Sequence, residues 1–367
     1  MRLSVGVDLH KTQFTVCYLS EDREVDEFKE YATNESGYSD FLHKLSDYVE
    51  KGYEVKSVVE STGNARYFRN RLLRYGIEVK VVNTMKFKII TQSVKKTDKH
   101  DARTLAEFLE KDMIPESHLC SQVSENIRRI LKSRAILVKA QVALKNQIHG
   151  LLMGYGIETK KGQLQSKKER ERVLNGLEDH YLKEHAALTV KPLFITIDHI
   201  GEEIKRLEKI LEELIKDDED VELLRSIPGI GLITASTIRA YTDDIKRYDT
   251  AKNYSSHAGL VPWVQNSNQT VHHGKITKRG PVELRTAFVQ VVMGMLRSQS
   301  KTGNYRIITN YHHMKKHKGS GRSIIAAARK ISVIVYHMLS KRETFDPVKM
   351  LNNKKYLEMQ QAALNVS

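Results

Sequence analysis

The sequence predicts an α/β domain, followed by a helical coiled-coil region and a mainly α-helical domain. Three observations predict this order. Short apolar runs alternate with amphipathic segments over the first 110 residues, a seven-residue apolar repeat follows, and two helical patterns then meet at a Gly-rich turn. A chain of 367 residues also exceeds the usual size of one hydrophobic core. We therefore expect domains at 1–118, 119–224 and 225–345, and a tail at 346–367.

The N-terminal segment alternates predicted strands with predicted helices. Apolar runs and β-branched residues predict strands at 3–9, 14–19, 24–31, 55–60 and 77–83. Helical spacing predicts helices between the third and fourth strands and between the fourth and fifth, the second of which ends at Gly76. Strands interleaved with helices through short connections are typical of an α/β sheet.

The middle of the chain has the apolar spacing of paired helices. Steps of three and four residues connect Ile197, Ile200, Ile204, Leu207, Leu211 and Leu214, and steps of seven connect Ile130, Leu137, Leu144 and Leu151. Two such helices can pair as a hairpin within one chain or as a dimerising arm between chains, and the pattern fits both. The charged stretch at 160–172 is expected to be an exposed connection.

The C-terminal third begins with a tight turn between two helical patterns, "RSIPGIGLITASTIRAY" at 225–241. The turn is typical of a helix-hairpin-helix, in which the backbone N–H groups near Gly229 and Gly231 can bind a phosphate. A turn that only packs two helices explains the same residues equally well. Beyond it we expect helices separated by polar loops at 263–280 and 311–323.

The charge of the chain is strongly positive and unevenly distributed. Lys and Arg number 60 against 45 Asp and Glu, and the segment 270–345 alone holds 15 cations and two acids. Such one-sided charge favours a polyanion as partner. The two cysteines, Cys17 and Cys120, are too few for a disulfide framework or a thiolate metal site. Because we find neither a signal-peptide pattern nor an apolar run of membrane-spanning length, we expect a soluble, cytoplasmic protein that does not bind a membrane.

Four carboxylates are placed where an α/β sheet gathers a site. Asp8 and Glu60 end predicted strands, and Asp98 and Asp101 lie three residues apart at the start of a predicted helix. Carboxylates held close together repel one another unless divalent cations lie between them, and hard oxygen ligands suit Mg²⁺ or Mn²⁺. The simpler alternative for Asp98 is a helix cap. Neighbouring cations are expected to bind a nucleic-acid backbone: Lys95, Lys96, Lys99 and Arg103.

These blocks resemble those of a known family. "GVDLHKTQFTV", "VVESTGNARYF" and "KKTDKHDARTLAEFL" resemble the N-terminal RuvC-like (RNase H-like) domain of IS110-family transposases. "SIPGIGLITASTI", "SSHAGLVPWVQNS" and "GKITKRGPVELRTAF" resemble the C-terminal domain of the same family, in the same order. The resemblance implies Mg²⁺- or Mn²⁺-dependent DNA cleavage and rejoining, and it assigns the metal to the set Asp8, Glu60, Asp98 and Asp101.

The resemblance also implies a serine nucleophile in the C-terminal domain. The matching residue is Ser267, which would form a 5′-phosphoserine link to DNA. Many family members have Gly after this serine, whereas this chain has Asn268, a residue that tolerates left-handed backbone angles. No Asp or His nearby in the sequence forms a convincing base for the hydroxyl, so we expect the N-terminal metal site to activate Ser267 or to stabilise the leaving oxygen.

Basic residues of the C-terminal third are expected to contact phosphates. The candidates are Lys275, Lys278, Arg279, Lys315, Lys316, Lys318 and Arg322. His313 and His317 have a spacing that zinc can use, but no third zinc-type ligand lies near them in the sequence.

The sequence is thus interpreted as an insertion-sequence transposase that acts on DNA. The family resemblance adds a noncoding bridge RNA as guide, and the predicted coiled coil favours a dimer or tetramer. Two alternatives remain. A hydrolytic nuclease resembling a Holliday-junction resolvase would use the same four acids with water, and a non-catalytic nucleic-acid binder would need neither the acids nor a metal. We expect the protein in the cytoplasm of a prokaryote, at the nucleoid when it is bound to DNA.

Overall fold

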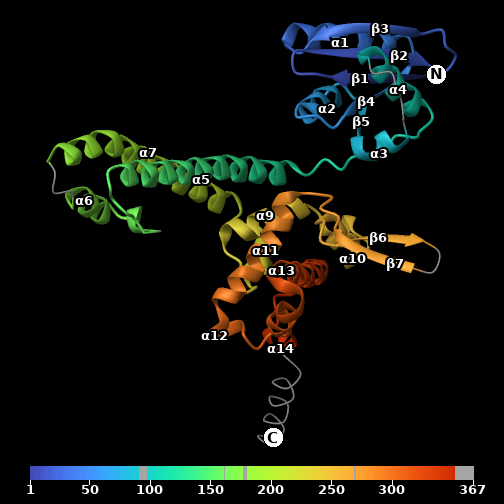
Figure 1. Ribbon diagram of the computed structural model, residues 1–367. Coiled ribbons are helices and arrows are strands. Elements are labelled where there is room, and N and C mark those ends of the chain that lie inside the picture. Colours follow the sequence, from blue (N-terminus) through green and yellow to red (C-terminus); the bar gives the residue numbers. More distant parts are fainter. Residues whose placement is uncertain (91–96, 161, 177–179, 268–269, 352–367) are drawn as a thin grey trace, which may run out of the picture. The chain divides into compact units, whose positions relative to one another are not determined.

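The computed structural model describes residues 1–367 apart from 91–96, 161, 177–179, 268–269 and 352–367. The chain divides into two compact units, Met1–Leu119 and Cys120–Ser367, and each is described by itself (Figure 1).

The first unit is built on a five-stranded mixed sheet with the order β3-β2-β1-β4-β5. The strands are β1 (Arg2–Leu9), β2 (Gln13–Ser20), β3 (Asp26–Ala32), β4 (Glu54–Glu60) and β5 (Glu78–Val82). β1, β2 and β3 pair antiparallel, whereas β4 pairs parallel with both β1 and β5. Its helices are α1 (Glu35–Glu50), α2 (Ala65–Leu73), α3 (Thr84–Ile90) and α4 (Asp98–Glu110). The α/β fold and all five predicted strands are confirmed, the third beginning two residues later than expected.

The two faces of this sheet carry different helices. Alternate residues of β1 and β4 pack with α1 and α2 into an aromatic-rich core, where Phe14 contacts Tyr38, Phe41 and Phe68. On the other face, Val58 of β4 packs with Leu105 and Leu109 of α4. The sheet is therefore covered on both sides, which explains why β1 reads as a nearly continuous apolar run.

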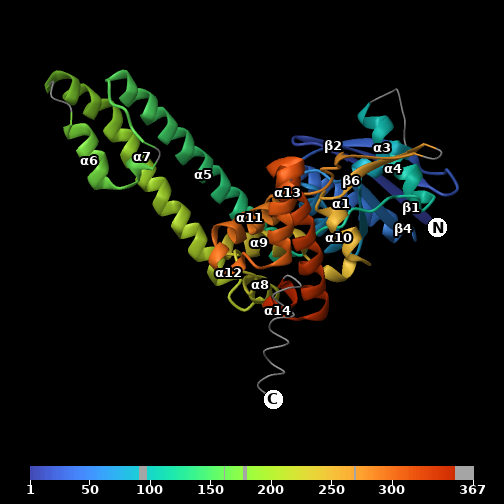
Figure 2. The same cartoon turned by 60° about the horizontal axis from the view of Figure 1, so that its bottom comes forward.

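The second unit begins with a pair of long helices, α5 (Gln122–Gly154) and α7 (His180–Leu214), which pack against each other (Figure 2). The two predicted apolar series therefore meet within one chain. Most described residues of the stretch at 160–172 are exposed, as expected, but the stretch also forms two short helices that were not expected, η1 (Gln163–Gln165) and the first part of α6 (Lys167–Asn175). Arg170 of α6 is buried, because its guanidinium donates to the Leu164 carbonyl oxygen and pairs with Asp198 at 2.7 Å.

The rest of the second unit is a helical core that carries one β-hairpin. Its elements are α8 (Glu219–Arg225), α9 (Leu232–Thr242), η2 (Ile245–Arg247), α10 (Ala251–His257), β6 (Pro262–Ser267), β7 (Thr270–Ile276), α11 (Val282–Arg297), α12 (Gln299–Thr302), α13 (Arg306–Lys341) and α14 (Pro347–Met350). Two loop predictions were wrong: 263–280 contains the β6–β7 hairpin, and 311–323 lies inside α13.

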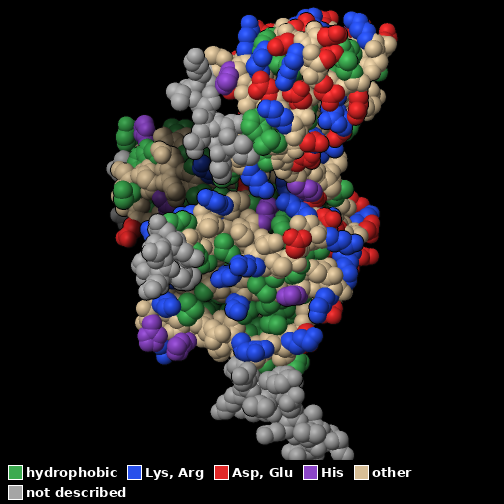
Figure 3. Space-filling model, turned by 90° about the vertical axis from the view of Figure 1, so that its right-hand side faces the viewer, with side chains coloured by type: hydrophobic (Ala, Val, Ile, Leu, Met, Phe, Trp, Pro, Cys, Tyr) green, Lys and Arg blue, Asp and Glu red, His purple; other side chains and the backbone are tan. Residues whose placement is uncertain are grey.

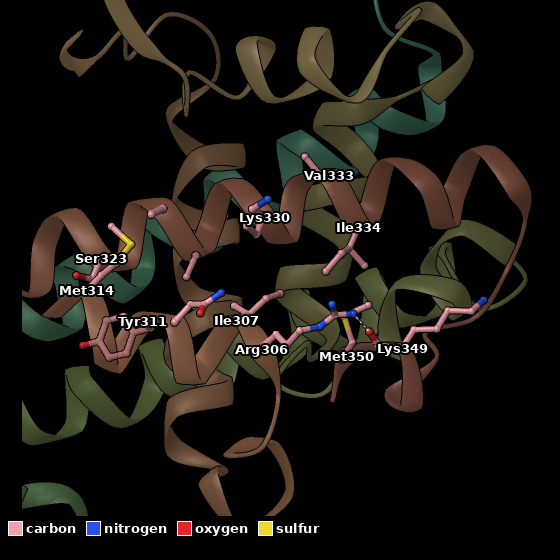
Figure 4. Close-up of a pocket in the computed structure, with 13 residues that line it drawn as sticks. Arg306, Ile307, Tyr311, Met314, Ser323, Lys330, Val333, Ile334, Lys349 and Met350 are labelled. Atoms are coloured by element: carbon pink, nitrogen blue, oxygen red, sulfur yellow. Dashed lines mark hydrogen bonds between the residues drawn. The ribbon is translucent and has the colours of Figure 1, made fainter. Parts of the chain in front are cut away.

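The helix α13 changes direction at Gly319, whose φ of 75° is outside the helical region. Residues before and after this glycine line an apolar pocket of about 350 Å³, in which Ile307 lies across from Ile334 and Tyr311 lies at the end near Met314 and Ser323 (Figure 4). Among the described helices, α13 alone is long and apolar enough to cross a membrane by length and composition. Of its most apolar window, 44% is buried inside the protein.

Candidate metal centre and nucleic-acid interface

Two of the four predicted carboxylates end neighbouring parallel strands. Val7 of β1 pairs with Val59 of β4, so the next residues, Asp8 and Glu60, lie side by side at the carboxyl edge of the sheet. The preceding residues, Val7 and Val59, pack on the face of the sheet that α1 and α2 cover. Since successive side chains of a strand point to opposite faces, the side chains of Asp8 and Glu60 point to the face that α4 covers.

The other two carboxylates lie in the first turn of α4. The alternative in which Asp98 caps this helix is wrong, because the cap is Thr97, whose side chain accepts a hydrogen bond from the His100 backbone N–H at 3.2 Å. Asp98 is free of that role, and its side chain is half exposed. Asp101, one turn further, is partly buried.

A close approach of α4 to β1 holds these two elements in place. A Cβ atom built on Gly6 would lie 2.0 Å from the Ala102 carbonyl oxygen and 2.5 Å from the Ala106 backbone nitrogen. The backbone of α4 thus rests directly on β1 where the strand has no side chain. Because Asp8 is only two residues beyond Gly6, the first turn of α4 is held beside its carboxylate.

The pKa of Asp8 reflects its burial and the charged side chains near it. Asp8 is 8% exposed, and burial raises the pKa of its carboxyl group above the ordinary value. The negative charges of Asp98 and Asp101 raise this pKa further, while His10 lowers it. A buried carboxylate with two acidic neighbours is unfavourable on its own, and a bound cation would remove the repulsion.

One residue of the centre was not predicted from the sequence. His10, in the turn after β1, places its Nε2 atom 3.1 Å from Asp8 Oδ2 and 3.8 Å from Asp98 Oδ2. Asp8, His10 and Asp98 offer ligand atoms that all lie within 4.8 Å of one another, so these three residues can hold a metal ion. The carboxylate oxygens fit Mg²⁺ or Mn²⁺, and of these two ions Mn²⁺ is the one that better accepts an imidazole nitrogen beside them. The turn position directly after Asp8 was the available signal in the sequence.

The cations predicted around this centre have different environments. Lys99 is exposed on the first turn of α4. Arg103 is ion-paired with Asp26 of β3 and lies over the Phe28 ring. Lys95 and Lys96 lie outside the described residues.

In the second unit, Ser267 is the last residue of β6 and pairs with Thr270 of β7. It therefore sits at the tip of the hairpin. The structure describes the backbone of Ser267 but not its side chain.

The Gly-rich turn between α8 and α9 has two different glycines. Gly229 has a φ of 91°, and a Cβ there would lie 2.9 Å from the Met295 backbone nitrogen, so this glycine allows the turn to pack against α11. Gly231 precedes α9 and has open space around it. Packing thus accounts for Gly229, while phosphate binding at Gly231 stays a prediction.

Four of the predicted C-terminal cations line one groove of about 890 Å³, together with Arg329. They are Lys275, Lys278, Lys318 and Arg322. Three others, Arg279, Lys315 and Lys316, are exposed outside the groove lining. In the view of Figure 3, Lys and Arg are spread over the second unit with few acidic side chains, whereas the first unit mixes both signs.

Comparisons with known proteins assign the class of the protein. A family model of the DEDD type of IS110 elements, described as "Transposase", matches residues 5–157, and the model of the "Transposase IS116/IS110/IS902 family" matches 221–306. With an acidic centre in the first match and a basic helical unit around the second, the molecule is a DNA transposase, an enzyme that cuts and rejoins DNA.

The chain belongs to the IS110 family of transposases. The transposase for insertion sequence element IS1111A of Coxiella burnetii is 27% identical over 93% of this chain and 90% of its own length. The transposase for IS1328 of Yersinia enterocolitica is 28% identical over 66% of the chain and 72% of its own. The pilin gene-inverting protein of Moraxella bovis is 24% identical over 93% of the chain and 97% of its own.

Proposed function

We propose that this transposase cuts and rejoins DNA through a covalent phosphoserine intermediate. Ser267 would be the nucleophile, and Mg²⁺ or Mn²⁺ would be held by Asp8, Glu60, Asp98 and Asp101, with His10 beside them. The observation that carries the proposal is the gathering of Asp8, Asp98 and Asp101: burial raises the pKa of the Asp8 carboxyl group, and the charges of Asp98 and Asp101 raise it further.

The topology supports a RuvC-like (RNase H-like) assignment for the first unit. Three antiparallel strands followed by two parallel ones, in the order β3-β2-β1-β4-β5, place the ends of β1 and β4 side by side at the sheet centre. The short helices α8 and α9, joined by the tight turn at 226–231, are compatible with a helix-hairpin-helix.

The proposed chemistry is an exchange of one phosphodiester for another. The Ser267 Oγ atom bonds to the phosphorus while the bond from phosphorus to the 3′ oxygen breaks, and the hydroxyl proton of serine ends on that 3′ oxygen. A bound divalent cation would stabilise negative charge on the phosphate and on the leaving oxygen. Asp8 would remain ionised next to this cation, and His10 would hold its Oδ2 atom in place through their 3.1 Å contact.

The reaction requires Ser267 and the carboxylates to meet at one phosphate. The meeting can occur within one chain or between subunits, and a dimer or tetramer would allow strands of two DNA molecules to be exchanged. The pilin gene-inverting relatives fit an enzyme that rejoins as well as cuts.

We also propose that a noncoding bridge RNA guides the enzyme, as the family resemblance suggests, and the net charge of +15 is compatible with an RNA partner in addition to DNA. Because DNA is the substrate, we place the protein in the prokaryotic cytoplasm, at the nucleoid when it is bound.

A denaturing gel tests the proposal. The full-length protein is incubated with Mg²⁺, DNA carrying the ends of its element and RNA transcribed from the flanking noncoding region. We expect a protein–DNA adduct with the wild type and with Ser300→Ala, an exposed serine of α12, and no adduct with Ser267→Ala or Asp98→Ala.

If the DNA is cleaved without forming an adduct, and Ser267→Ala cleaves it as well, the reaction is a resolvase-like hydrolysis instead. DNA binding without any metal-dependent cleavage would establish a non-catalytic binder.

A further inference from the structure

The groove between the β6–β7 hairpin and the middle of α13, here called the hairpin groove, is lined by cations on both sides. Lys275 and Lys278 come from the hairpin side, and the others come from α13: Lys318, Arg322 and Arg329. All five side chains are exposed. Among the residues that the structure describes, no carboxylate lines the groove and none of these five cations is ion-paired.

Five uncompensated cations around one depression attract a polyanion. Surfaces that bind no charged ligand usually mix both signs, as the first unit does (Figure 3). Each cation that contacts a phosphate releases a counterion from the nucleic acid, which makes binding favourable and dependent on salt.

The floor of the hairpin groove is apolar, and this feature separates two kinds of nucleic acid. Leu260 is 1% exposed, and the other floor residues are partly buried: Pro262, Ile276, Ile325 and Ala326. A duplex presents phosphates and sugars on its outside and stacks its bases within, so it would leave such a floor without a partner. An unpaired strand exposes the faces of its bases, which pack well on apolar and aromatic side chains.

An aromatic ring lies at the edge of the groove. Trp263 of β6 is 50% exposed. Its ring covers Gly274 of β7, where a Cβ atom would lie 2.7 Å from Trp263 Cε3. Because Gly274 itself lines the groove, the indole is available for stacking next to the cations.

We propose that the hairpin groove binds an unpaired nucleic-acid strand, with its phosphates on the five cations and a base stacked on Trp263. This inference rests on the proposed function and deepens it, because strand exchange and RNA guidance both present unpaired strands. The same contacts fit single-stranded DNA and single-stranded RNA. Ser267, the proposed nucleophile, lies at the tip of the same hairpin that would hold the strand.

The chain itself supplies a reporter, because Trp263 is its only tryptophan. The full-length protein is titrated with oligo(dT), oligo(U) or a blunt DNA duplex of equal length, and tryptophan emission is followed. EDTA is present, so that no strand is cut. We expect saturable quenching by an unpaired strand and a duplex midpoint at least about tenfold weaker.

Variants place the effect at the groove. Lys275→Gln/Arg322→Gln is expected to weaken unpaired-strand binding about tenfold and to reduce the slope of log affinity against log salt by about 1.4, the value for two lost phosphate contacts. The matched control, Lys252→Gln/Lys341→Gln, removes two exposed cations that lie outside the groove lining and is expected to bind as the wild type does. Lys318→Gln/Arg329→Gln provides a second groove variant, and thermal unfolding checks that each variant is folded.

Quenching by oligo(dT) alone would identify DNA as the ligand, and quenching by oligo(U) alone would identify RNA. Three results would overturn the proposal: no quenching by either strand, equal affinity for the duplex, or wild-type binding by both groove variants. Normal strand binding without adduct formation would refute the proposed function alone, whereas adduct formation without groove binding would refute this inference alone.

Discussion

A methyl group at Gly6 should move the carboxylates of α4, Asp98 and Asp101, away from Asp8 on β1. The substitution Gly6→Ala places a Cβ atom 2.0 Å from the Ala102 carbonyl oxygen and 2.5 Å from the Ala106 backbone nitrogen. Ordinary van der Waals separation is about 3.5 Å, so the first contact is short by about 1.5 Å. Both contacts are backbone atoms of α4, and no side-chain rotation can relieve them. The helix must therefore move away from β1.

The displacement has two measurable costs. Overpacking of this kind lowers the free energy of unfolding by about 1–3 kcal/mol. A shift of about 1 Å between Asp8 and the first turn of α4 would cost about 100-fold in the rate of DNA cleavage, because catalytic groups tolerate little misplacement. The two costs are similar in free energy, because a 100-fold loss of rate corresponds to about 2.7 kcal/mol.

The assay compares Gly6→Ala with the wild type in thermal unfolding and in Mg²⁺-dependent DNA cleavage. The control is Gly150→Ala in α5, whose new methyl group meets nothing within 4 Å. We expect the control to cleave normally and to be slightly more stable, since Ala favours a helix over Gly. A Gly6→Ala protein with full stability and full cleavage would refute the packing argument.

Three further outcomes follow from the geometry. Because the pKa of Asp8 is raised in the folded protein, its protonated form stabilises the metal-free protein fully below the ordinary carboxyl pKa of 3.8, and this stability is lost as pH rises through the raised pKa. Unfolding scans in EDTA should therefore show a loss of stability with rising pH. The variant Asp8→Asn should lack this loss, and Mg²⁺ should reverse it in the wild type. His10→Ala should weaken Mn²⁺ binding about tenfold, measured by titration calorimetry, and unchanged affinity would exclude His10 from the centre. Arg239→Leu should lower the free energy of unfolding in denaturant by roughly 3 kcal/mol, because the Arg239 guanidinium is 17% exposed and bonds to Asp218 and Ser124; a change below about 0.5 kcal/mol would contradict this.

The sequence predicts four strands of the first unit well because β1, β2 and β4 are largely buried and β5 buries alternate residues, whereas β3 is mostly exposed and was placed less accurately. The runs that became β1 and β4 could be recognised from apolar content alone, and their ends pointed to Asp8 and Glu60. The role of Gly6 was not visible, because it depends on the backbone of a helix almost a hundred residues later.

The β6–β7 hairpin was missed for a physical reason. Trp263 and Val264 are about half exposed, so the part of β6 whose side chains the structure describes lacks the buried face that produces an apolar alternation. In α13, the polar stretch at 311–323 was predicted as a loop, but within it only Gly319 leaves the helical region. The polar residues around it, such as Lys315, are simply the exposed side of the helix.

The most direct test of the acidic centre is Mn²⁺ binding followed by electron paramagnetic resonance, with the full-length protein and no nucleic acid. Our account predicts saturable binding by the wild type and by Glu50→Gln, an exposed carboxylate at the end of α1, and a loss of at least about tenfold in affinity for Asp8→Asn and for Asp98→Asn. Equal Mn²⁺ affinity in all four proteins would contradict the assignment of a metal to these residues.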